Sequence, residues 1–432
     1  MFSKILVANR GEIAIRIIRS CKEMGISTVS VYSEADRDSL HVALADQSIC
    51  IGSAAPSDSY LNIERIVSAA LATGAQAIHP GYGFLSESAR LAELCEKQQL
   101  AFIGPHSSII SKMGDKDEAR RTMSEAGVPV IPGSGVLESS EDAEKAAEQI
   151  GYPLMIKARS GGGGRGIRVI NSPEELAAAF QTASHEAGEA FGDRALYIEK
   201  QIYPAKHIEV QLLADEYGKI VCLAERECSI QRNNQKLLEE SPSPAVDERL
   251  REKLSQAAIK AAQAVGYVNA GTVEFLLDAA GEFYFMEMNV RLQVEHAVTE
   301  QVTGIDLVKW QIRIAAGVPL DFGQEDVAII GNSIECRINA STVGTVEFLH
   351  VPGGPRVRFD SALWMGYSVP PYYDSLLGKL IVHASSREEA IRKMHAALCE
   401  LVIKGVPNNI DEQIEFVSDE RFRRGEYYTD FV

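Results

Sequence analysis

Two glutamates, Glu274 and Glu287, face each other across a predicted β-hairpin. Two runs with high strand propensity, 272–277 and 282–288, flank a short Ala-Gly turn. The register that this turn sets places the two carboxylates in directly opposed positions, where like charges destabilise a sheet. A divalent cation between the carboxylates would remove the conflict, so the hairpin is predicted to bind a metal.

Polar and apolar residues alternate strictly after the second glutamate of this hairpin. An extended chain points alternate side chains to one face, and the polar set is Glu287, Asn289, Arg291, Gln293 and Glu295. The alternative is a solvent-exposed strand face. However, the set lacks the Ser, Thr and Lys typical of such a face, and one of its acids opposes another acid. These features favour a site for a metal and an anion.

A glycine-rich loop, 161–164, lies between two predicted strands in the segment PLMIKARSGGGGRGIRVI. Its backbone N–H groups are free to close on phosphate oxygens, and Lys157 and Arg165 add positive charge. The loop is not a Walker P-loop, because no G-K-[ST] follows and the next run favours a strand. The alternative is a flexible linker, which would rarely have apolar strands and basic residues on both sides.

Together, the glycine-rich loop, the carboxylate pair and the alternating polar residues are typical of a site for phosphoryl transfer. The glycine loop and Lys157 could hold ATP phosphates. The carboxylate pair and Asn289 could hold Mg²⁺, which prefers oxygen ligands and substrate phosphates. Arg291 and Gln293 could bind a small anion, with Glu295 as a nearby base.

Several other polar residues and segments, each considered alone, are predicted to have a structural role rather than a catalytic or binding one. Lys116 resembles a surface lysine, ALYIEKQI an amphipathic strand, and Arg337 a member of a structural ion pair. The charge-rich segment ERECSIQRNNQKLLEE is predicted to be a solvated pair of polar strands.

The elements that position these residues suggest three domains in 432 residues. Near the N-terminus, strands at 4–8, 28–32 and 75–79 alternate with helices at 12–24 and 63–72, which indicates a parallel sheet covered by helices. A small α/β segment then runs to about residue 203. A helix capped by Asp247 and ended by Gly266 precedes the hairpin. The C-terminal hundred residues combine strands, Pro-rich turns and a late helix with a Ser386–Glu389 capping box.

The charge, the cysteine spacing and the lack of long apolar runs argue against several classes of protein. The net charge of −17 opposes binding to nucleic acid or to anionic membranes, so an anionic substrate needs a local basic site. The seven cysteines show no paired spacing, as expected in a reducing compartment. No apolar run suits a signal peptide or a membrane span. A cytoplasmic location is expected.

The sequence resembles the ATP-grasp superfamily and, within it, the biotin carboxylases. The resemblance runs almost end to end through motifs in the same order: ANRGEIAIRIIR, AIHPGYGFLSE, FIGP, MGDK, GGGGRG, YIEK, HIEVQ, QK with EESPSP, AGTVEF, EMNVRLQVEH, ECRINA and VPPYYDS. It implies a Rossmann-like N-terminal domain at 1–115, an ATP-grasp domain at 116–330 and an α+β C-terminal domain at 331–432. The ATP-grasp domain would include a mobile glycine-rich lid at about 131–203.

The resemblance also implies roles for single residues. ATP would contact Lys116, Lys157, Gly163, Gly164, His207 and the backbone of Glu199, Lys200 and Ile202. Mg²⁺, or Mn²⁺ in its place, would be held by Glu274, Glu287 and Asn289. Bicarbonate would contact Lys236, Arg291, Gln293 and Val294. Glu295 would be the general base, Arg337 would steady the biotin enolate, and Tyr82 would lie near biotin.

The implied reaction forms carboxyphosphate from ATP and bicarbonate and then carboxylates biotin. No Met-Lys-Met biotin-attachment motif occurs in the chain, so biotin would be carried by a separate biotin carboxyl carrier protein. Carboxyltransferase subunits and a homodimer are further implied, with acetyl-CoA carboxylase as the parent complex. The alternatives are another ATP-grasp carboxylate ligase and a non-catalytic nucleotide-binding regulatory protein.

The sequence departs from the family pattern at several positions. Asn234 replaces a histidine, Val290 a threonine and Ala297 a proline, and Arg159 and Ser160 stand where smaller residues are common. The segment STVGTVEFLHVPGG, which follows Asn339, is shorter than in the family.

Overall fold

The N-terminal part of the computed structural model, which describes residues 1–137, 139–159 and 167–432, is built on a parallel sheet with strand order β3-β2-β1-β4-β5. Its strands are β1 (Lys4–Val7), β2 (Ser27–Ser33), β3 (Gln47–Gly52), β4 (Ala77–His79) and β5 (Ala101–Phe102). Its helices are α1 (Gly11–Glu23), α2 (Leu40–Leu44), α3 (Ile63–Thr73), α4 (Ala89–Lys97) and α5 (Ser107–Gly114), with short 3₁₀ turns η1 (Glu34–Asp36) and η2 (Pro56–Asp58). The parallel sheet predicted from the alternating pattern is confirmed.

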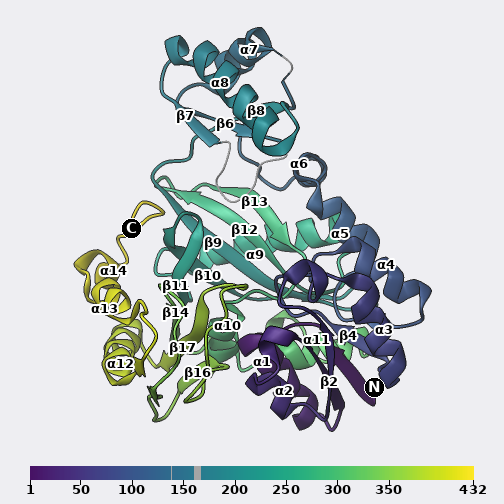
Figure 1. The fold of residues 1–432 in the computed structure, drawn as a ribbon. Coiled ribbons are helices and arrows are strands. Elements are labelled where there is room, and N and C mark those ends of the chain that lie inside the picture. Colours follow the sequence, from purple (N-terminus) through teal and green to yellow (C-terminus); the bar gives the residue numbers. More distant parts are fainter. Residues whose placement is uncertain (138, 160–166) are drawn as a thin grey trace.

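A small lobe stands apart from the rest of the molecule (Figure 1). The helix α6 (Lys116–Glu125) leads into it from the N-terminal part. The lobe contains α7 (Ser140–Ile150), β6 (Leu154–Ala158), β7 (Ile167–Ile170), α8 (Pro173–Phe191) and β8 (Leu196–Lys200). Its antiparallel sheet, in the order β7-β6-β8, packs against both helices through an apolar core of its own. The glycine-rich loop between β6 and β7 lies outside the described residues.

The largest sheet has eight antiparallel strands in the order β13-β12-β9-β10-β11-β14-β17-β16. Its first five strands in sequence are β9 (Ala205–Ala214), β10 (Ile220–Arg232), β11 (Gln235–Ser241), β12 (Asn269–Asp278) and β13 (Phe283–Asn289). The predicted hairpin is β12–β13, and its register pairs Glu274 with Glu287. The prediction of opposed carboxylates is therefore confirmed.

The helix α9 (Glu248–Val265) explains which side chains point to each face of this sheet. Asp247 caps the helix and Gly266 ends it in the left-handed conformation, as predicted. Alternate residues of β9 and β12, such as Val210 and Val273, pack against α9 in one apolar cluster. Because side chains alternate along a strand, the residues between them point away from α9 and are free to be polar.

The C-terminal part extends the same sheet. It contributes β14 (Asn332–Asn339), β16 (Val357–Ser361) and β17 (Leu376–Ala384), while β15 (Phe348–His350) pairs with β18 (Val402–Lys404). The remaining helices are α10 (His296–Thr303), α11 (Leu307–Ala315), η3 (Gln324–Asp326), α12 (Arg387–Glu400), α13 (Ile410–Ser418) and α14 (Glu420–Arg424). The sequence indicated one late helix, whereas α12, α13 and α14 follow one another along one side of the molecule (Figure 1).

The predicted capping box at α12 forms only in part. The Ser386 hydroxyl accepts the backbone N–H of Glu389, as expected. The Glu389 carboxylate instead accepts hydrogen bonds from the N–H and hydroxyl of Ser385, one residue earlier. The second half of the capping box is therefore formed with Ser385 instead of Ser386.

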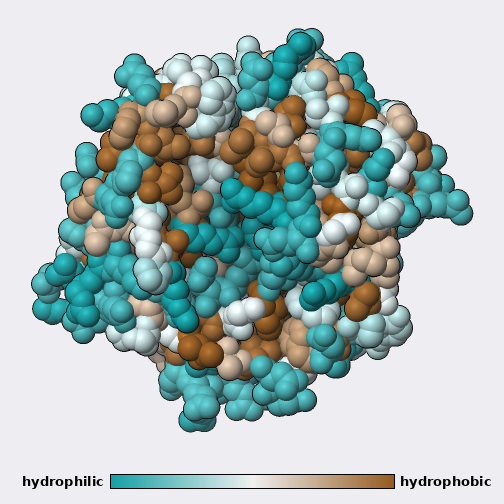
Figure 2. All heavy atoms as spheres, turned by 90° about the horizontal axis from the view of Figure 1, so that it is seen from below, coloured by the Kyte–Doolittle hydropathy of each residue, from teal (hydrophilic) through white to brown (hydrophobic). Residues whose placement is uncertain are grey.

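The face seen from below carries hydrophobic areas separated by a hydrophilic centre (Figure 2). Such a mixed surface agrees with the charged content of 24% in the sequence. Within the described ranges, none of the helices combines the length and the apolar character needed to cross a membrane.

Candidate active site

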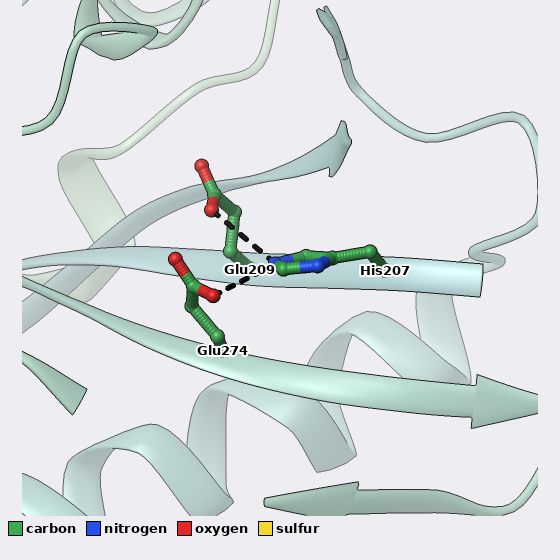
Figure 3. Close-up of side chains that lie close together, drawn as sticks. All are labelled: His207, Glu209 and Glu274. Atoms are coloured by element: carbon green, nitrogen blue, oxygen red, sulfur yellow. Dashed lines mark ion pairs between the residues drawn. The ribbon is translucent and has the colours of Figure 1, made fainter. Parts of the chain in front are cut away.

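A row of acidic side chains crosses three neighbouring strands. Glu274 on β12 pairs with Glu287 on β13 and, on its other side, with Glu209 on β9. Glu209 in turn pairs with Arg226 on β10. The carboxylates of Glu209 and Glu274 both point toward the imidazole of His207, whose Nε2 lies 2.9 Å from Glu274 and 3.8 Å from Glu209 (Figure 3). Sequence analysis found two of the three acids and missed Glu209.

Lys236 compensates much of this negative charge. Its Nζ donates to Glu209 at 2.5 Å, to Glu274 at 3.0 Å and to Glu295 at 2.6 Å. Lys236 bonds to Glu274 but not to Glu287, so it does not remove the predicted conflict between these two carboxylates. The neighbouring Glu274 carboxylate raises the pKa of Glu287, because two like charges so close together disfavour ionisation.

Glu295 is the carboxylate at which two cations meet. Its side chain is buried, and it accepts a hydrogen bond from Lys236 through one oxygen and from Arg337 at 3.0 Å through the other. Burial opposes ionisation of Glu295, but Lys236, Arg337 and Arg226 outweigh it and hold the pKa well below its usual range. The carboxylate is charged and therefore able to accept a proton.

Arg337 bridges Glu295 and a further buried acid, Glu239 on β11. The Arg337 Nε donates to Glu239 at 2.6 Å. The structural ion pair that was predicted for Arg337 when considered alone is therefore present. The arginine also reaches the same carboxylate as Lys236, so it belongs to the site as well.

The charge-rich strand pair β10–β11 is buried except around its turn, at residues 231–236, so the prediction of a solvated pair was wrong for most of its length. Arg226 on β10 is fully buried. It donates to Gln293 at 2.7 Å, to Gln211 at 2.8 Å and to Thr299 at 2.9 Å, and it also pairs with Glu209. Two of these partners lie on the neighbouring strand β9, and the other two lie in the distant segment 293–299.

The alternating polar residues reach the site, although the strand ends early. β13 ends at Asn289, and an irregular segment continues to α10 rather than the extended chain expected to 295. Gln293 still donates to Glu274 at 2.6 Å. Arg291 donates to Asn289 at 2.9 Å and pairs with Glu87 at 3.1 Å. Glu87, in the FLSE motif, was not singled out from the sequence.

The predicted metal ligands fit a hard divalent cation. Asn289 Nδ2 lies 2.8 Å from Glu274 Oε1 and 3.5 Å from Glu287 Oε1, so the three side chains lie close together. Carboxylate and amide oxygens are the ligand type that Mg²⁺ prefers, but here Asn289 turns its N–H toward the carboxylates and its Oδ1 accepts from Arg291 at 2.9 Å. A metal at this site would require the amide to turn over. The ligand atoms of His207, Glu209 and Glu274 also lie within 4.8 Å of one another. Lys236 bonds to both carboxylates of this second group and, in the predicted set, to Glu274 but not to Glu287.

The predicted ATP contacts are distributed over separate parts of the molecule. Lys157 and Glu199 pair with each other at 2.6 Å in the small lobe. Lys200 donates to backbone carbonyls of the same lobe, and Ile202 follows β8. Lys116 is exposed at the start of α6, and its charge opposes the rise in the pKa of Glu287. His207 alone lies inside the central cluster, while Gly163 and Gly164 lie outside the described residues.

Tyr82 joins the site through Glu12 and Lys379. The Tyr82 hydroxyl donates to Glu12, and the same carboxylate lies 3.3 Å from Lys379 Nζ. Lys379 also donates to the Val294 carbonyl at 2.6 Å. Neither Glu12 nor Lys379 was assigned a role from the sequence. Lys379 stands in a mainly apolar strand, whereas Glu12 is one of several charged residues of α1.

Four departures from the family pattern have a local structural setting. Asn233 and Asn234 form the two-residue turn between β10 and β11, with φ of 51° and 62°. Asn tolerates this left-handed conformation better than most residues. Val290 and Ala297 are buried in apolar clusters. Arg159 pairs with Asp193 at 3.0 Å, and Ser160 lies outside the described residues.

Comparison with known protein families gives three matches that together span the chain. Residues 1–110 match the biotin carboxylase N-terminal domain, and residues 335–432 match the biotin carboxylase C-terminal domain. Residues 115–322 match the ATP-binding domain of the carbamoyl-phosphate synthase L chain.

Similar proteins cover the chain from end to end. Biotin carboxylase 1 of Bacillus subtilis is 54% identical over 100% of this chain and 98% of its own length. The biotin carboxylase of Haemophilus influenzae is 50% identical over 98% of this chain and 97% of its own length.

Solved structures agree with this assignment. The biotin carboxylase domain dimer of Hydrogenobacter thermophilus 2-oxoglutarate carboxylase, solved with MgADP, ADP and bicarbonate, has a TM-score of 0.95 at 50% identity and covers 100% of this chain and 97% of its own. The biotin carboxylase of Campylobacter jejuni has a TM-score of 0.95 at 48% identity and covers 100% and 98%.

Proposed function

This chain belongs to the biotin carboxylase family and carboxylates biotin with ATP, Mg²⁺ and bicarbonate, and we propose that it does so at the buried charge cluster around Lys236 and Glu295. The family, the ATP-grasp fold and the assignment as a ligase, all predicted from the sequence, are confirmed. The observation that carries the proposed site is the Glu295 carboxylate, which is buried and accepts hydrogen bonds from two cations.

In the proposed first step, bicarbonate enters beside Glu295 and takes over hydrogen bonds from the nearby donors. Lys236, Arg291, Gln293 and the Val294 backbone bind and orient the anion. Glu295 removes its proton as the bicarbonate oxygen attacks the γ-phosphorus of ATP, which gives carboxyphosphate and ADP. Loss of a hydrogen bond from Lys236 makes Glu295 more basic at the moment when the proton must move, because an opposite charge nearby favours the ionised carboxylate.

In the proposed second step, carboxyphosphate gives CO₂ and phosphate, and phosphate takes the ureido proton of biotin. Arg337 then donates a hydrogen bond to the enolate oxygen of biotin as negative charge develops there. A guanidinium suits this role because it stays protonated throughout. The ureido nitrogen attacks CO₂ and forms the N–C bond of carboxybiotin. Tyr82 is linked to the cluster through Glu12 and Lys379 and is the proposed neighbour of biotin.

The nucleotide is proposed to lie between the small lobe and the central sheet. Lys116, Lys157, Gly163 and Gly164 contact its phosphates. The backbone of Glu199, Lys200 and Ile202 meets the adenine, and His207 the ribose. Glu274, Glu287 and Asn289 hold Mg²⁺, which when bound neutralises phosphate charge.

A bicarbonate-dependent ATPase assay, with and without free biotin, tests this proposal. We expect ATP hydrolysis to require bicarbonate and to rise on addition of biotin. Hydrolysis that biotin does not stimulate would contradict the proposed site. The middle domain also resembles carbamoyl-phosphate synthases, so ammonia and other acceptors serve as the comparison substrates.

We further propose that the chain works within a larger complex. Its relatives include the 2-oxoglutarate carboxylase small subunit of Hydrogenobacter thermophilus, and the biotin carboxylase domain of that carboxylase was solved as a dimer. A homodimer, a separate biotin carboxyl carrier protein and carboxyltransferase partners of the acetyl-CoA carboxylase type are the proposed assembly. Size-exclusion chromatography and co-purification with biotinylated carrier test it.

The domain boundaries at 115 and 330, the lid at about 131–203 and the cytoplasmic location also stand as proposals. The small lobe visible in Figure 1 supports the lid. The seven unpaired cysteines support a reducing compartment, and fractionation of native cells tests the location.

A further inference from the structure

Lys379, on β17, is a fully buried lysine for which neither the motifs nor the proposed reaction gives a role. A buried ammonium is costly unless it is paired and hydrogen-bonded. Its Nζ lies 2.6 Å from the Val294 carbonyl and 3.3 Å from the Glu12 carboxylate. The shorter contact is to the neutral carbonyl, so the ammonium is aimed at the backbone rather than only at the opposite charge.

The carbonyl that Lys379 holds belongs to the peptide bond that leads into Glu295. Fixing the plane of this peptide restricts the direction in which the Glu295 side chain leaves the backbone. Glu295 also stands just before α10, where the irregular segment after β13 ends. Since that segment belongs to no strand, a side-chain donor is needed to hold its backbone.

The same ammonium connects the base to the Tyr82 loop. Tyr82 donates to Glu12, Glu12 pairs with Lys379, and Lys379 donates to Val294. These four residues come from separate segments of the chain and meet only in the folded protein. The path joins the proposed biotin neighbour to the proposed bicarbonate site.

We propose that Lys379 is a positioning residue, which fixes the Val294–Glu295 peptide so that the Glu295 carboxylate meets Lys236 and Arg337 in the productive orientation. This inference rests on the proposed role of Glu295 as general base. If Lys379 served only to neutralise the Glu12 carboxylate, it would not need its hydrogen bond to the Val294 carbonyl. The presence of that hydrogen bond favours a positioning role over a purely structural one.

The test compares Lys379→Met with the double variant Glu12→Gln/Lys379→Met. The double variant removes Glu12, the carboxylate paired with Lys379, while the nearby Glu335 and Asp360 remain. It is therefore expected to recover part of the thermal midpoint that the single variant loses. We expect kcat/KM for bicarbonate to fall by roughly 100-fold in both, as for a misplaced catalytic group, while the dissociation constant for ATP stays unchanged. Recovery of kcat/KM together with stability in the double variant would overturn the proposal.

Hydrogen–deuterium exchange of peptides covering 290–297 gives a readout that does not depend on turnover. Exchange is expected to rise there in both variants and to stay unchanged in β12. Unchanged exchange at 290–297, or a double variant that does not fold, would assign Lys379 to stability and overturn the inference. Wild-type protein without biotin-stimulated ATP hydrolysis would instead contradict the proposed function, while the exchange experiment would still decide the role of Lys379.

Discussion

Replacing Arg226 with methionine tests whether the buried charge cluster holds the site together. Arg226 is fully buried and donates to Glu209, Gln211, Gln293 and Thr299. Methionine retains an unbranched apolar side chain but removes every donor. The variant leaves Glu209 with Lys236 as its remaining close cation, and Lys236 already bonds to two other carboxylates.

The expected cost follows from the contacts that are lost. Removing one partner of a buried ion pair costs about 3–5 kcal/mol, and a buried acceptor left without any donor costs about 1–3 kcal/mol. Because Lys236 still compensates part of the charge, we expect Arg226→Met to lower the free energy of unfolding by about 4 kcal/mol. The double variant Glu209→Gln/Arg226→Met removes the uncompensated charge and should cost about 2 kcal/mol less than the single variant.

Urea unfolding followed by circular dichroism measures these free energies. Arg249→Met is the matched control, because Arg249 is exposed on α9 and its replacement should change stability by less than about 0.5 kcal/mol. The KM for bicarbonate should rise in Arg226→Met, since Gln293 loses a donor that orients it. A single variant within about 1 kcal/mol of wild type, or a double variant no more stable than the single one, would refute the reasoning.

Four further outcomes are expected. Glu295→Gln should abolish bicarbonate-dependent turnover while calorimetry shows normal ATP binding; persistent turnover would contradict its role as base. Removing Mg²⁺ with a chelator should stop ATP hydrolysis and Mn²⁺ should restore it, whereas Glu274→Gln should raise the metal concentration required. Asn234→Ala should lower stability by about 1 kcal/mol because of the left-handed turn, while Asn234→Gly should not; equal unfolding midpoints would argue against turn strain. Burial lowers the pKa of His79 to about 3, so the unfolded state binds a proton that the folded state refuses between about pH 6.5 and 3. The free energy of unfolding should therefore decrease as the pH is lowered through that window. Between pH 7 and 5, His79→Asn should lose about 2 kcal/mol less of this free energy than wild type, measured by urea unfolding.

Local patterns in the sequence were sufficient for several elements. The β12–β13 register was predictable because a short turn joins two adjacent strands, which leaves one pairing that matches both. The caps of α9 were predictable because Asp247 and Gly266 act on backbone groups within a few residues. The strand pair β10–β11 was also found, but its burial was not, because the partners of Arg226 are far away in sequence.

The sequence by itself therefore determined the family motifs, the opposed Glu274 and Glu287, and the alternation that sends polar groups toward one face. Only the tertiary structure decided which distant groups complete that face. Glu209 reaches the acidic row because β9 pairs with β12 across a long stretch of chain, and that pairing is selected by burial of the opposite face against α9. Lys379 became a member of the site for the same reason: a buried carboxylate or carbonyl needs a donor, and any strand that packing brings close enough can supply it. Lys236 was expected from the family motif, but its contacts with three carboxylates were not.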